Sequence, residues 1–97
     1  MGVRHAREYA DILKDLTDAV SGINRSYTFF EMEKGEWEAL ADAEKSEVME
    51  ALADDVFFGL GEETSIAVGD GIVTYHPKRH VIEVTQGDNV SHVVRLI

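Results

Sequence analysis

The spacing of apolar residues changes near Gly61, and this change constrains the fold more than any other feature of the chain. Before it, apolar side chains recur every three or four residues, which is the spacing of an amphipathic helix. After it, they alternate with polar side chains, which is the spacing of a half-buried strand. The sequence therefore predicts an α+β domain in which two amphipathic helices are followed by a four-stranded antiparallel β-meander.

Two long helices are expected before the change of period. The first runs from about Arg4 to Ser21, and Gly22 is expected to end it in a left-handed conformation. The second begins at Asp42, a residue type that commonly caps helix N-termini, and ends in the glycines of 59–61. On both helices the acidic residues follow a strip opposite the apolar one, which is typical of a solvated helix face.

Two shorter pieces lie between these helices. Residues 25–33 include the run Tyr-Thr-Phe-Phe, whose strand propensity favours an extended segment or an edge strand. Residues 37–41 have apolar side chains at a spacing that fits about one turn of helix before Asp42.

Turn signals divide the last third of the chain into four alternating runs. These signals are Gly69-Asp70-Gly71, Pro77-Lys78-Arg79 and Gly87-Asp88-Asn89. Three-residue hairpin loops at all three places give four antiparallel strands, at about residues 64–68, 72–76, 80–85 and 90–96. Because Arg79 suits the third loop position poorly, a middle loop that is one residue longer stays open.

This register sorts the strand residues onto two faces. The face that helices are expected to cover takes most of the apolar residues: Ile66, Val68, Ile72, Ile82, Val84, Val90, Val94 and Leu96. The outer face takes a smaller apolar group with two charged neighbours: Val73, Tyr75, Val81, Val93, Glu83 and Arg95. A solvent-facing sheet surface is normally polar, so this second apolar group predicts that something covers it.

Two layouts would cover the outer face. In the first, one helix packs on each side of the sheet. In the second, both helices share one side and the outer faces of two copies meet in a homodimer. The second layout is favoured because it needs only two layers in each chain.

The composition excludes several classes of function. The 97 residues form one domain, 1–97, because chains of this length seldom divide. The net charge of −10 repels a nucleic-acid backbone, so direct binding to DNA or RNA is not expected. There is no Cys to serve as a metal ligand or nucleophile, and no apolar run long enough for a signal peptide or membrane span. The cytoplasm is the expected compartment.

Few residues suggest catalysis. In the three-residue register His76 and His80 face each other across the middle turn, but a zinc site needs three or four ligands. The serines lack the spacing of a nucleophile with its base. No metal or other cofactor is therefore predicted, and the chain is not expected to be an enzyme.

The sequence thus predicts a small acidic binding or regulatory protein. We expect it to self-associate, or to dock a protein partner, through the outer sheet face: Val73, Tyr75, Val81, Glu83, Val93 and Arg95. A first alternative is that the acidic helices mimic nucleic acid and so inhibit a basic protein. A second alternative is a small metal-dependent hydrolase that uses His76 and His80.

Overall fold

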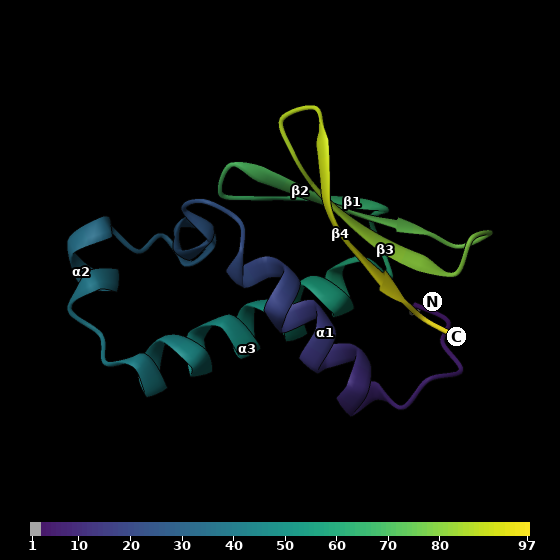
Figure 1. The fold of residues 1–97 in the computed structure, drawn as a ribbon, viewed down its shortest axis with the longest axis horizontal. Helices are drawn as coiled ribbons and strands as arrows, with labels where there is room; N and C mark the ends of the chain where they lie inside the picture. The colour runs from purple at the N-terminus through teal and green to yellow at the C-terminus, as the bar shows by residue number, and fades with distance from the viewer. Residues whose placement is uncertain (1–2) are drawn as a thin grey trace.

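The chain folds as helices followed by strands, as the change of period predicts (Figure 1). A computed structural model describes residues 3–97. The helical part comprises α1 (Tyr9–Ser21), the 3₁₀ helix η1 (Ser26–Phe30), α2 (Lys34–Glu38) and α3 (Asp42–Gly59). The strands are β1 (Ser65–Val68), β2 (Gly71–His76), β3 (Val81–Gln86) and β4 (Asn89–Arg95). They form one antiparallel sheet in the order β1-β2-β3-β4, so the predicted α+β class and β-meander are confirmed.

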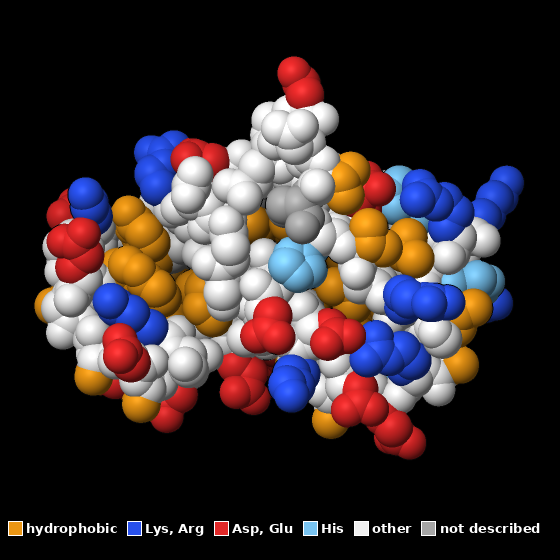
Figure 2. Space-filling model, in the orientation of Figure 1, with side chains coloured by type: hydrophobic (Ala, Val, Ile, Leu, Met, Phe, Trp, Pro, Cys, Tyr) orange, Lys and Arg blue, Asp and Glu red, His pale blue; other side chains and the backbone are white. Residues whose placement is uncertain are grey.

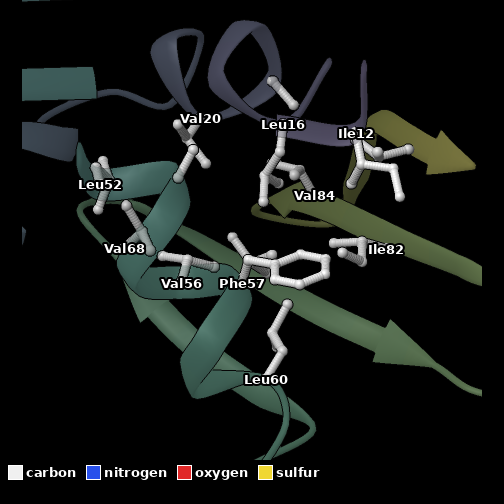
Figure 3. Close-up of a cluster of buried hydrophobic side chains, with 14 of the residues drawn as sticks. Ile12, Leu16, Val20, Leu52, Val56, Phe57, Leu60, Val68, Ile82 and Val84 are labelled. Carbon is white, nitrogen blue, oxygen red and sulfur yellow. The ribbon is translucent and has the colours of Figure 1, made fainter. Parts of the chain in front are cut away.

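Both long helices lie on the same face of the sheet (Figure 1). Helix α1 packs against α3 and against β4. Figure 3 shows side chains of α1 and α3 directed toward those of the sheet, with Leu16, Phe57 and Ile82 among them. The helices are therefore placed as in the second of the two layouts left open by the sequence, and the homodimer of that layout stays a prediction. No helix within residues 3–97 is at once long enough and apolar enough to cross a membrane.

Helix α1 begins at Tyr9 rather than at Arg4. The residues before it make other hydrogen bonds: the backbone N–H groups of Ala6 and Arg7 donate to the carbonyl of Leu96, at 2.8 and 3.1 Å. An α-helix over these residues would leave that carbonyl without these donors. The N-terminal segment therefore closes against the end of β4 instead of extending the helix.

Two other helix ends differ in detail from expectation. Gly22 ends α1 with φ of −82°, which is not the predicted left-handed conformation. The N-cap of α3 is Ala41, and Asp42 is its first helical residue. The backbone N–H of Ala41 donates to the carboxylate of Glu44 at 2.9 Å. Glu44, in place of Asp42, therefore supplies the side chain that binds the cap position.

The prediction of an extended segment over residues 25–33 is wrong. Arg25 and Glu31 have left-handed φ values of 58° and 59° at the two ends of η1. The carbonyl of Arg25 accepts hydrogen bonds from the backbone N–H and the hydroxyl of Thr28, at 3.0 and 2.7 Å. The Arg25 guanidinium also forms an ion pair with Asp70 at 2.6 Å. These local interactions hold a tight turn, which overrides the strand propensity of the aromatic residues.

The first two loops of the sheet differ by one residue from the predicted length of three. The first turn has two residues, Gly69 and Asp70, and the middle loop has four, residues 77–80. A change of one residue turns every side chain of a strand to the opposite face. Strand β2 is therefore reversed relative to the prediction. The two changes cancel at β1, where the predicted facing is correct.

The last hairpin combines a two-residue turn, Gly87-Asp88, with a β-bulge in β4. Before the bulge, Val90 lies one residue out of the predicted register and pairs with Thr85. Beyond the bulge the predicted register returns, and Glu83 pairs with Val93. The extra residue at the bulge thus compensates for the shorter turn.

Candidate functional site

The outer face of the sheet carries four large apolar side chains that are exposed or half-buried. Ile72, Val90 and Val93 keep 48%, 54% and 46% of their surface exposed, and Val81 is half-buried. They come from three strands, and the pairing places Ile72 and Val90 in one cross-strand row through Thr85. No helix within residues 3–97 lies over this face (Figure 1). We call these four residues the outer patch.

Four of the six residues predicted for partner binding lie on this face. Val81, Glu83, Val93 and Arg95 point outward from β3 and β4, and their pairings are the predicted ones, Val81 with Arg95 and Glu83 with Val93. The changes of loop length do not alter which residues of β3 and of the end of β4 face outward. This part of the prediction therefore agrees with the structure.

The outward facing predicted for Val73 and Tyr75 is wrong. Val73 is 0% exposed and Tyr75 is 9% exposed, and both belong to the core beneath the helices. The reason is the four-residue middle loop, which reverses β2. The same reversal brings Ile72 to the outer face, and the two-residue last turn brings Val90 there. The signal that could have identified both is the pair of Gly-Asp steps, since Gly followed by Asp is common in two-residue hairpin turns.

Polar groups lie among and beside the residues of the outer patch. His76 and Glu83 are diagonal neighbours on β2 and β3, and His76 Nε2 lies 3.6 Å from the Glu83 carboxylate. His76 Nε2 is buried and has no hydrogen-bond partner within residues 3–97. Glu83 pairs with Val93 and follows Val81 by two residues on β3, so it lies between members of the outer patch, and Arg95 lies in the neighbouring row.

The two histidines of the middle loop are not brought together as a metal site. His76 pairs with Val81, and His80 stands at the end of the loop with a left-handed φ of 54°. Nowhere in the described part of the chain do three or more His, Asp or Glu side chains gather closely enough to hold a metal ion. The geometry on which the hydrolase alternative depended is therefore not formed.

Charge is divided sharply between the helical part and the sheet. Residues 64–97 carry three acidic and three basic side chains, whereas residues 1–63 carry sixteen acidic and six basic ones. The whole net charge of −10 thus belongs to the helical part. Figure 2 shows acidic side chains along the lower side of the molecule, where α1 and α3 lie. The strands that form the outer face are neutral in total.

A shallow acidic hollow separates α1 from α3 on the side away from the sheet. It has a volume of about 480 Å³ and is lined in part by Tyr9, Glu47, Glu50 and Asp54. The Tyr9 hydroxyl donates a hydrogen bond to the Asp54 carboxylate. Burial, with this hydrogen bond and the negative charge of Asp54, raises the pKa of Tyr9 to about 12. The pair therefore ties the two helices together across the hollow.

The segment of η1 and α2 gathers aromatic side chains that the sequence did not single out as a group. Four of the eight aromatic residues lie between residues 27 and 37. The rings of Tyr27 and Trp37 stack with centroids 5.6 Å apart, and Lys45 lies over the Trp37 ring. Phe29 and Phe30 meet edge to face at 5.4 Å. These contacts hold the segment together, because ring pairs in such geometries stabilise one another.

Comparison of the chain with protein-family models, with curated proteins and with solved structures found no match. The outer face presents branched apolar side chains, with one acid among them and one guanidinium and one imidazole beside them. Such a surface can pack against a complementary surface that is apolar and carries matching charges.

Proposed function

We propose that this chain is a small binding or regulatory protein that forms a weak homodimer through the outer face of its sheet. The observation that supports this proposal is the outer patch: four neighbouring apolar side chains on a sheet face that no helix of the chain covers. Burial of apolar surface is the main driving force of protein association. The cytoplasm is the compartment that we expect.

The distribution of charge indicates which surface two copies would use. Two copies that each carry −10 repel one another wherever their helical surfaces meet. The neutral sheet surface is where they can approach with the least repulsion. A two-fold axis through the outer faces would also let Glu83 of one copy meet Arg95 of the other, twice, because a symmetric interface repeats each contact.

The size of the face sets the expected affinity. With strands about 4.8 Å apart and a rise of about 3.3 Å per residue, four strands of about six residues cover roughly 400 Å² in projection. Two such faces bury about 800 Å² or somewhat more, which is below the roughly 1,200 Å² of a stable interface. We therefore expect a dimer with a dissociation constant in the micromolar range or weaker.

Sedimentation velocity over a wide range of protein concentration tests this proposal. The wild-type chain should shift from monomer to dimer as the concentration rises, and Val93→Lys should remain monomeric because it places a charge within the patch. Phe58→Lys is the matched control, since Phe58 is 68% exposed and lies on α3 away from the sheet face. A wild-type chain that stays monomeric throughout, or a dimer that Val93→Lys leaves intact, would contradict the proposal.

The separation of charge supports a second candidate function. The excess of ten negative charges is concentrated on the helical part, which could occupy the basic surface of a nucleic-acid-binding protein. This proposal is tested with a chain of poly-lysine and with a basic nucleic-acid-binding domain as probes. Binding that is specific for the folded domain and that falls steeply as salt rises would support mimicry. Equal binding to both probes would argue for charge alone.

A further inference from the structure

We propose a second binding site, for a small anion with a short apolar body, at the end of the sheet where the β2–β3 loop meets the N-terminal segment. A hollow of about 430 Å³ lies there, between residues 3–8, the end of α3 and the loop of residues 77–80. Figure 2 shows Lys and Arg side chains gathered at this end of the molecule, on the right. The site is separate from the outer patch, because it opens on the inner side of the sheet.

The floor of the hollow is apolar and firmly held. It includes Leu60, which is 2% exposed, and Tyr75, together with Pro77 of the loop. The backbone of Tyr75 donates to the carbonyl of Thr64 at 2.8 Å. A pocket of this volume is at the lower end of the range that small-molecule ligands occupy, which leaves room for one ring or a short aliphatic chain.

The Tyr75 side chain places a hydrogen-bond donor in the hollow. Its hydroxyl oxygen accepts a hydrogen bond from the backbone N–H of Arg4 at 3.2 Å, which fixes the N-terminal segment over the sheet. The hydroxyl still has its own proton to donate, and no acceptor for it is found among residues 3–97. A ligand that enters the hollow could accept a hydrogen bond from this hydroxyl.

The rim of the hollow is cationic. Arg4, Lys78 and His80 line it, and neither Arg4 nor Lys78 forms an ion pair within residues 3–97. Lys14, Lys45, Arg79 and Arg95 likewise form no ion pair within residues 3–97, so what marks Arg4 and Lys78 is their position on the rim of the hollow.

The backbone of the loop has an uncommon conformation beside the hollow. His80 holds a left-handed φ of 54°, an uncommon conformation for a residue other than glycine. Its carbonyl accepts a hydrogen bond from Leu96 at 2.9 Å, so the end of β4 helps to keep the loop in place. Residues in such conformations are often found at binding sites, where the surrounding structure holds them.

These groups define the ligand by its chemistry. A carboxylate or phosphate would lie between Arg4 and Lys78 and accept a hydrogen bond from the Tyr75 hydroxyl. Hydrogen bonds that involve a charged group are stronger than those between neutral groups. An apolar body would cover Leu60 and Pro77. Glu62, which also lines the hollow, repels any anion there, and it repels a dianion more strongly than a monoanion.

Backbone amide shifts of the isotope-labelled full chain test this site. We would titrate it with phenyl phosphate, benzoate, inorganic phosphate and benzyl alcohol, in the Val93→Lys background so that the outer patch does not contribute. Phenyl phosphate or benzoate, or both, should shift the amides of Gly61, Thr64 and Lys78 in a saturable way. Inorganic phosphate and benzyl alcohol should each bind at least about tenfold more weakly, which corresponds to about 1.4 kcal/mol.

Two variants separate this site from general electrostatic attraction. Lys78→Gln should weaken binding of the phenyl anions by about fivefold or more, because it removes a charge-assisted hydrogen bond. Lys34→Gln removes an exposed cation of α2, far from the hollow, and should leave the binding unchanged. Equal binding of benzyl alcohol would overturn the anion preference, and equal binding of inorganic phosphate would overturn the role of the floor. Equal loss in both variants, or no saturable shift with either phenyl anion, would overturn the site itself.

Discussion

The two faces of the sheet consist of alternate residues of the same four strands, yet they have different roles. On the inner face Val73, Ile82 and Val84 are 0% exposed beneath α1 and α3. On the outer face Ile72 and Val93 keep about half of their surface in contact with solvent. Both faces carry large apolar side chains, so the presence of such residues does not by itself distinguish them. What distinguishes them is which face the helices cover, and the loop lengths determine that for each residue.

Neighbouring residues of β2 provide the strongest test of this difference. Val73→Asp places a carboxylate in the core and should cost more than about 4 kcal/mol, enough to unfold most of a domain this small. Ile72→Asp, one residue earlier, should cost less than about 1 kcal/mol. Circular dichroism during thermal unfolding measures both. If the two variants were equally stable, or their order were reversed, the assignment of faces would be wrong.

A pair of truncations measures the same difference without adding charge. Ile82→Ala removes buried side-chain volume beneath the helices and should lower the free energy of unfolding by about 3 kcal/mol. Val93→Ala on the outer face should lower it by less than about 0.5 kcal/mol at a concentration where the chain is monomeric. Urea unfolding monitored by Trp37 fluorescence gives both values. Comparable losses at the two positions would show that the outer face is also packed.

The two hairpin turns at one end of the sheet sharpen the comparison further. Gly69 and Gly87 both have left-handed φ values, of 52° and 61°, so alanine is strained at either position by about 1 kcal/mol. At Gly69 a Cβ would also lie 2.5 Å from the backbone carbonyl oxygens of Asn24 and Arg25, whereas at Gly87 it would meet open space. Gly69→Ala should therefore destabilise the domain at least twice as much as Gly87→Ala in the same urea experiment. Equal losses would mean that the contact with residues 24 and 25 is not maintained.

The smallest expected effect concerns the side of the helices that faces away from the sheet. The folded pKa of Tyr9, about 12, lies above its unfolded value of about 10. The stabilisation by the Tyr9 hydroxyl is therefore complete below pH 10 and is lost as the pH rises from 10 through 12. Tyr9→Phe should cost about 1 kcal/mol at neutral pH. It should also make stability less dependent on pH above 10, as unfolding curves at pH 9 and 11 would show. An unchanged alkaline dependence would exclude Tyr9 as its source.

The order and type of the main elements could be predicted from the sequence because each has a strong periodic pattern. Helix α3 and the four strands lie within one or two residues of their predicted limits. Residues 25–33 were mispredicted because a short aromatic run has no period, and the left-handed turn at Arg25 depends on the distant residue Asp70. The start of α1 depends in the same way on Leu96, which lies at the other end of the chain.

The candidate site could be predicted only in part. The face of the sheet on which a side chain lies depends on whether the loop between two strands has an odd or an even number of residues. Val81 and Val93 were placed correctly since β3 and the end of β4 keep the predicted register. Tyr75 and Val73 were placed on the wrong face because the middle loop has four residues and not the predicted three. The sequence contained a warning in Arg79, which fits a three-residue loop poorly, but it did not decide between the two lengths.

The contact between α1 and β4 also constrains how the domain can be made. The first helix packs on the last strand, and residues 6 and 7 bond to Leu96. During synthesis, the apolar stripe of Ile12, Leu16 and Val20 must therefore wait for nearly the entire domain to leave the ribosome before it finds its final neighbours. Folding of this domain is expected to follow the emergence of its last strand, with its acidic surface keeping the unfinished chain apart from others.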